Sequence, residues 1–241
     1  MSHSIADSLS AAGVRRSAGL LPRLSEAWVV GRDAAHRYLL FLRFALVNLA
    51  GLALFAAAWL EGWVGLLLEA DRTRLVRVIV LVFLVGLVWC GQRALAISRE
   101  LNALKARAPR AQGHVARYLH QAAGLDGASR GNLAAVLRIK LYARIAPIRH
   151  LANTLVLLGL IGTVIGFIIA LSGVDPELAS DVAAVGPMIA TLIEGMSVAL
   201  HTTLVGSLLN IWLMVAYRIV EGGVVRLFTQ AVEMGEAHVR P

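Results

Sequence analysis

The sequence contains few of the residues from which catalytic and metal centres are built. Its single cysteine, Cys90, lies in an apolar run, so we expect a small buried side chain and neither a disulfide framework nor a cysteine metal cluster. His114 and His120 are six residues apart and do not share one helical face. There is no P-loop, GxGxxG sequence or nucleophile elbow. We therefore expect a protein that is not an enzyme and holds no cofactor or metal.

Charged residues are also scarce, at 16% of the chain, whereas hydrophobic residues make up 58%. This excess of apolar side chains is greater than a soluble core of this size needs, and it favours a lipid environment. The net charge of +8 would suit a nucleic-acid partner, but the basic residues lie beside apolar segments. That placement indicates orientation in a membrane, so we expect membrane lipid and not nucleic acid as a partner.

Four apolar segments are candidates for membrane spans. About 20 helical residues cross a bilayer. Leu151–Ser172 has no charged residue and Gly195–Tyr217 has only the ionisable His201, while the uncharged runs Phe44–Leu60 and Val78–Gln92 are shorter and pair as a hairpin. The predicted fold class is therefore an all-α integral membrane protein with four transmembrane helices.

The distribution of lysine and arginine predicts the orientation of these spans. Residues 93–149 hold 11 Lys and Arg against two acidic residues, which indicates the cytoplasm. The connection between the last two spans holds Asp175, Glu177 and Asp181 and no basic residue, so we expect it on the opposite side. Both termini of this multi-pass membrane protein are then expected in the cytoplasm.

The same pattern divides the chain into five regions. The N-terminal region has no apolar stretch long enough for a secretory signal, and we expect it to form a helix on the membrane surface. The basic segment is expected to form helices at 94–108, 114–123 and 132–145, with a turn at 124–131. The predicted regions are an N-terminal amphipathic segment (1–38), a peripheral hairpin (39–97), a basic cytoplasmic helical segment (98–149), a hairpin of the last two spans (150–217) and a short cytoplasmic tail (218–241).

Polar residues inside the last span are the main functional candidates, because a polar side chain within lipid needs a partner. At about 100° per residue, Glu194, His201 and Thr202 fall on one continuous face of this helix. Thr203 falls on the other side, together with Ser207 and Asn210. The last helix therefore has two polar sides, as expected between two protein or water-lined surfaces.

The third span has a stripe of small residues formed by Gly159, Thr163, Gly166 and Ala170, with Gly162 beside it. Such a stripe allows two helices to approach closely, and it would leave the Thr163 hydroxyl in the middle of the contact. An ion path needs a narrow seam of this kind. Alternatively, the threonines only bond the carbonyls of their own helix, and the glycines only pack helices.

The stretch LANTLVLLGLIGTVIGFIIALSG followed by MIATLIEGMSVALHTTLVGSLLN resembles the two core helices of the MotA/TolQ/ExbB proton channel family. Four spans with both termini inside resemble MotA more than the three-span TolQ and ExbB. Two features depart from the family pattern: the cytoplasmic segment is shorter than expected of a flagellar MotA, and His201 stands where we expect an apolar residue.

The resemblance implies a ring of five copies around the single helices of a partner similar to MotB, TolR or ExbD, which supplies the Asp that carries the proton. It also implies an energy-transducing motor that couples ion flow to mechanical work in the cell envelope. Thr163 and either Thr202 or Thr203 would line the path, and Glu194 would lie near its outer end. The glycines expected to pack the channel helices are Gly159, Gly162, Gly166, Gly195 and Gly206.

Three alternatives stay open at the level of sequence. The chain could be a membrane scaffold or assembly subunit that conducts no ion. His201 could relay protons, since its ordinary pKa is near 6.5, or it could hydrogen-bond a neighbouring helix. The transported ion could be H⁺ or Na⁺, because threonine hydroxyls can hold water or coordinate Na⁺.

Overall fold

The computed structural model describes residues 39–65, 73–105, 113–174 and 182–237, and these form helices and turns without a strand. Three predictions fall outside this part of the chain: the N-terminal surface helix, the end of the 94–108 helix, and the acidic connection with Asp175, Glu177 and Asp181. Residues 40–241 form one structural unit, and the account below concerns that unit alone.

Four of the described segments are long and apolar enough to cross a membrane. They contain helices α3 (Leu39–Leu60), α5 (Leu75–Lys105), α8 (Ala146–Ser172) and α9 (Val182–Ala237). Each predicted span lies within one of these helices, so the predicted set of four apolar helices is confirmed. α5 and α9 are much longer than a bilayer requires, with 31 and 56 residues.

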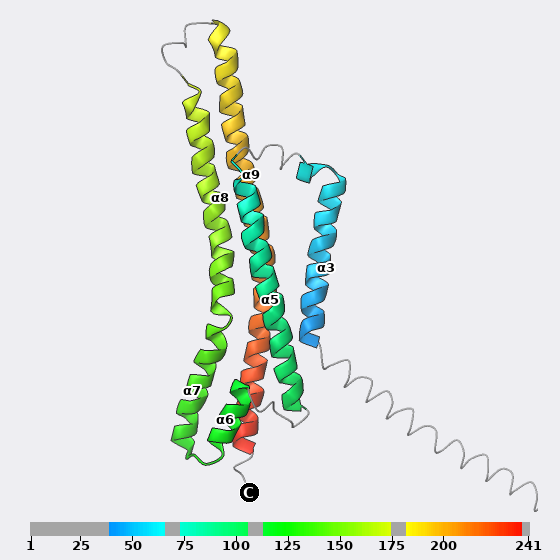
Figure 1. The fold of residues 1–241 in the computed structure, drawn as a ribbon, viewed down its shortest axis with the longest axis vertical. Helices are drawn as coiled ribbons and strands as arrows, with labels where there is room; N and C mark the ends of the chain where they lie inside the picture. Colours follow the sequence, from blue (N-terminus) through cyan, green and yellow to red (C-terminus); the bar gives the residue numbers. More distant parts are fainter. Residues whose placement is uncertain (1–38, 66–72, 106–112, 175–181, 238–241) are drawn as a thin grey trace, which may run out of the picture. The chain divides into compact units, whose positions relative to one another are not determined.

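α8 and α9 form an antiparallel hairpin, and α5 packs against both helices of that hairpin (Figure 1). α5 runs parallel to α9, because Phe83 contacts Trp212 and Gly86 approaches Leu213. α3 runs antiparallel to α9: Asn48 bonds Trp212, and Leu40 approaches Gly223. α3 and α5 therefore both lie beside the C-terminal two thirds of α9.

Two shorter helices, α6 (His114–Ala122) and α7 (Gly127–Ala143), pack against the C-terminal part of α9. α6 matches the helix predicted at 114–123. The predicted turn at 124–131 is shorter in the structure, because Asp126 occupies the N-cap and the helix begins at Gly127. Pro147 stands in the first turn of α8, where its missing N–H costs no helical hydrogen bond, and it marks the boundary between α7 and α8.

The segment predicted as a short tail continues α9 as a helix to Ala237. Val220, Val224, Leu227 and Ala231 recur every three or four residues along it and are all buried. This spacing puts their side chains on one face of the helix, toward α5, α6 and α7. Burial of that face explains why the helix extends far beyond the apolar span.

Arginines from four helices lie at the same end of the apolar spans. Arg149 of α8 lies about one to two helical turns from the level of Arg218 of α9, since Leu155 approaches Gly206 in the antiparallel hairpin. The contacts of Phe83 and Asn48 with Trp212 place the arginines of α5 and α3 within about one helical turn of that level. We call the set the arginine belt; it consists of Arg43, Arg93, Arg149 and Arg218.

Candidate functional site

The backbones of α8 and α9 touch along a seam of glycines. A Cβ atom added to Gly166 would lie 2.6 Å from the carbonyl oxygen of Gly195, and one added to Gly206 would lie 2.7 Å from that of Leu155. A Cβ on Gly195 would collide with the backbone of Ala170. No side chain fits at these three positions, so the close approach of α8 and α9 requires glycine there.

The centre of the seam is Gly162 and not Thr163. Gly159, Gly162 and Gly166 are buried against α9, whereas Thr163 is only partly buried, at the edge of the contact. Its hydroxyl donates a hydrogen bond to the carbonyl of Leu160, at 2.5 Å. The face of α8 that meets α9 is therefore rotated relative to the predicted stripe of small residues. The Thr163 side chain lies beside the contact instead of within it.

Thr202 fills the space above Gly162. Its side chain is 1% exposed and would collide with a Cβ at Gly162. Its hydroxyl lies 2.9 Å from the carbonyl oxygen of Val198 and 3.1 Å from that of Ala199, both on its own helix. In this structure Thr202 acts as a packing residue whose polar atom is already satisfied.

Thr203 and Thr163 lie on the same side of the hairpin. The Thr203 hydroxyl donates across the seam to the carbonyl oxygen of Gly159, at 3.1 Å. Gly159 is one helical turn before Thr163, so both belong to the same edge of α8. Ser207 and Asn210 continue this side of α9 at intervals of four and three residues from Thr203. We call Thr163, Thr203, Ser207 and Asn210 the threonine flank.

Glu194 and His201 point to a different side of α9. His201 is two residues from Thr203, which turns its side chain about 200° away. Its Nδ1 atom lies 3.2 Å from the hydroxyl of Ser197, one turn earlier, with Glu194 a further turn back. We call Glu194, Ser197 and His201 the histidine flank. Ser197 was missed in the sequence, although its spacing of four residues from His201 is a signal for a helical pair.

The histidine flank faces the same direction as the side of α9 that α3 and α5 cover. Trp212 follows Glu194 by 18 residues, which is five complete turns. Its ring lies 5.1 Å from that of Phe83 of α5, and its Nε1 donates to Asn48 of α3 at 3.1 Å. From these contacts, α5 begins and α3 ends at the level of about residues 200–204 of α9, so Glu194 and Ser197 lie beyond their ends (Figure 1).

The structure thus distributes the five predicted ion-path residues over three surroundings. Thr163 and Thr203 share the threonine flank, Thr202 lies within the seam, and Glu194 and His201 share the histidine flank. The threonine flank lies on the side of the α8–α9 hairpin away from α3 and α5. Its hydroxyls are therefore free of cover from the other described helices that span the apolar region.

Comparison with known proteins gives a family for this arrangement. The family model for the MotA/TolQ/ExbB proton channel family matches residues 117–233, which run from α6 through α7 and α8 into the C-terminal part of α9. A search of curated proteins and a search of solved structures each found no match. The predicted resemblance is confirmed, and with four apolar helices the chain is a multi-pass membrane subunit of proton-channel type. Residues 117–233 of this chain are therefore similar to the MotA/TolQ/ExbB proton channel family.

Proposed function

We propose that this chain is the ion-conducting subunit of an energy-transducing motor in the bacterial inner membrane, and that it conducts protons. Five copies form a ring around single-span partner helices that resemble MotB, TolR or ExbD and carry an intramembrane Asp. Ion flow past that Asp moves the ring relative to its partner and performs work on the cell envelope. The family match and the four apolar helices support the channel subunit on which this proposal is built.

One observation carries the assignment of the ion path. The threonine flank includes a row of hydroxyl groups at the depth of the apolar segments, on the side of the α8–α9 hairpin that α3 and α5 leave uncovered. The amide oxygen of Asn210 on the same flank is buried. In a ring, this side faces the axis and the partner helices, while α3 and α5 form the periphery. Thr163 and Thr203 then hold water or the ion opposite the partner's Asp.

The arginine belt supports one orientation of the protein. We propose that the belt lies at the cytoplasmic boundary, with α6, α7, the C-terminal part of α9 and both termini in the cytoplasm. The acidic connection between α8 and α9 is then on the outer side. Glu194 is then near the outer end of α9, and His201 lies deeper in the membrane on the histidine flank.

Proton flux into vesicles that contain the chain and its co-expressed partner tests the path. Each threonine contributes one hydrogen bond, worth about 0.5–1.5 kcal/mol, so Thr163→Ala with Thr203→Ala lowers the flux about tenfold or more. Thr154→Ala is the matched control, because Thr154 bonds its own helix at 2.9 Å and is turned about 180° from Thr163.

Undiminished flux in the double variant would overturn the path. A non-conducting scaffold predicts a different result: no flux in the wild type, partner binding that persists in every variant, and function that does not depend on the ion gradient. Replacing H⁺ by Na⁺ as the only gradient distinguishes the two ions in the same vesicles.

A further inference from the structure

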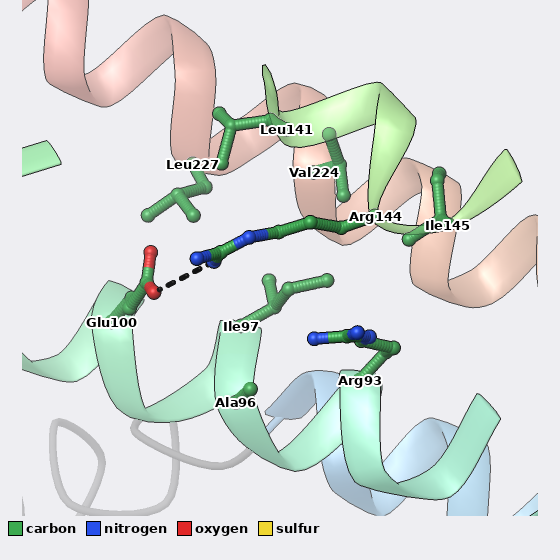
Figure 2. A pocket seen from close by; sticks show the side chains of 9 residues that line it. All are labelled: Arg93, Ala96, Ile97, Glu100, Leu141, Arg144, Ile145, Val224 and Leu227. Carbon is green, nitrogen blue, oxygen red and sulfur yellow. Dashed lines mark hydrogen bonds and ion pairs between the residues drawn. The ribbon is translucent and has the colours of Figure 1, made fainter. Parts of the chain in front are cut away.

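A small pocket lies between α5, the junction of α7 and α8, and the C-terminal part of α9 (Figure 2). Apolar side chains such as Leu141, Val224 and Leu227 form part of its wall. Three charged residues enter it: Arg93 and Glu100 from α5, and Arg144 from the C-cap of α7. Figure 2 shows the side chains of both arginines extended along the same hollow. We call this site the arginine pocket.

The charged groups of the arginine pocket satisfy one another only in part. Arg144 Nη1 lies 3.5 Å from Glu100 Oε1, a long contact, and this is the pocket's one ion pair among the described residues. Within the same part of the chain, the buried Arg93 Nε and the buried Glu100 Oε2 have no hydrogen-bond partner. Buried polar groups almost always have one, so the pocket has room for a ligand that supplies both an acceptor and a donor.

The surroundings of the pocket are electropositive. The pKa of His114, at the start of α6, is lowered from 6.5, first by desolvation and next by the nearby charge of Arg144. Arg117 and Lys140 lower it further, and Glu100 is the one nearby carboxylate that raises it. An anionic group therefore gains attraction from several cations in this region, beyond the two inside the pocket.

The position of the pocket puts it at the depth of lipid headgroups. Arg93 belongs to the arginine belt, which lies where the uncharged runs of four helices end. That level corresponds to the lipid headgroups of one leaflet. The free space between the side chains admits a group about the size of a water molecule, so one phosphate oxygen enters and the rest of the ligand lies at the mouth.

We propose that the arginine pocket binds a phosphate ester that carries a neighbouring N–H or O–H group, the chemistry of ethanolamine and glycerol headgroups. The phosphate oxygens accept hydrogen bonds from Arg93 and Arg144. The ligand's own N–H or O–H donates to Glu100 Oε2. Bound at the point where α5, α7 and α9 meet, such a ligand ties the spanning helices to the basic helical segment. A membrane phospholipid or a soluble phosphate compound could supply this group.

Thermal unfolding of the full chain in detergent, followed by tryptophan fluorescence, tests the site. Dihexanoyl-phosphatidylethanolamine is expected to raise the melting temperature saturably. Dihexanoyl-phosphatidylcholine, which lacks the N–H donor, should bind about tenfold more weakly. Arg93→Met should weaken the binding of the ethanolamine lipid by about tenfold or more. Arg99→Met is the matched control on the same helix, because Arg99 is exposed and outside the pocket.

Inorganic phosphate and phosphoethanolamine distinguish the two sources. A saturable response to phosphoethanolamine that Arg93→Met removes supports the same site with a soluble ligand. If the ligands change the melting temperatures of wild type, Arg93→Met and Arg99→Met equally, the proposed site is wrong. This is the result expected of a pocket that holds only water. Native mass spectrometry of the wild-type chain needs no variant: preferential retention of the ethanolamine lipid supports the proposal, and equal retention of both lipids contradicts it. Neither measurement depends on ion flux.

Discussion

The two flanks of the α8–α9 hairpin carry different chemistry in different surroundings. On the threonine flank, Thr163 and Thr203 present neutral hydroxyls that bond backbone carbonyls, on the side that α3 and α5 leave open. On the histidine flank, the ionisable His201 bonds Ser197 beyond the ends of α3 and α5. The two flanks therefore present neutral hydroxyls on one side of α9 and the acidic and imidazole side chains of Glu194 and His201 on another.

The largest expected effect comes from a substitution in the glycine seam, because the positions of both flanks depend on that contact. Gly195→Val puts a branched side chain into the backbone of Ala170, and neither helix can move away without losing the contact. We expect a loss of stability of about 3 kcal/mol or more and little folded protein. Thermal unfolding and size-exclusion chromatography in detergent measure both quantities.

Gly186→Ala is the control for this substitution. Gly186 also lies in α9, but no atom lies within 4 Å of a Cβ built there. Alanine is the better helix former, so this variant should be neutral or slightly more stable. If Gly195→Val is as stable as Gly186→Ala, the seam is not a close contact and the division into two flanks has no structural basis.

The sequence was sufficient to predict the spans and the glycines of the channel hairpin, but not the direction in which the seam faces. Apolar runs predict which part of each helix lies in the membrane, because burying a charged side chain in lipid costs much free energy. The sequence of a single helix does not show which of its faces meets another helix. For that reason the sequence pattern predicts Thr163 in the middle of the contact, whereas Gly162 occupies that place in the structure. Thr202 and His201 were placed on one face, yet one is 1% exposed in the seam and the other is on the histidine flank.

The extent of α9 and the arginine pocket also exceeded what sequence patterns showed. The buried spacing of Val220, Val224 and Leu227 was present in the sequence, but its meaning depends on α5 and α7 packing against it. Arg93 and Arg144 are 51 residues apart, and only the fold brings them together. Long-range contacts of this kind leave no local periodicity.

The second prediction compares the flanks directly. His201→Gln keeps a polar group beside Ser197 and lies away from the threonine flank, so we expect flux within about twofold of wild type. The sequence allowed His201 on the ion path, and its position in the structure favours the smaller effect. Flux measured between pH 5.5 and 8 gives the comparison. A loss of flux as large as that of Thr163→Ala with Thr203→Ala would show that both flanks belong to one ion path. A changed pH profile of flux would show that His201 relays protons.

The smallest expected effect concerns His114, whose pKa departs from its ordinary value and which lies outside both flanks. Burial and the charge of Arg144 lower the pKa of His114 below 6.5, so the unfolded chain binds a proton there more readily than the folded chain. Stability is therefore complete above pH 6.5 and falls as the pH drops from 6.5 toward the lowered pKa. His114 is still partly accessible to solvent, which screens its charge interactions, so we expect the change to stay within about 0.5 kcal/mol. His114→Gln should abolish this part of the pH dependence in thermal unfolding and leave the pH profile of flux unchanged. If His114→Gln alters that profile instead, the pH response belongs to the α6 region, and neither flank of the hairpin senses pH.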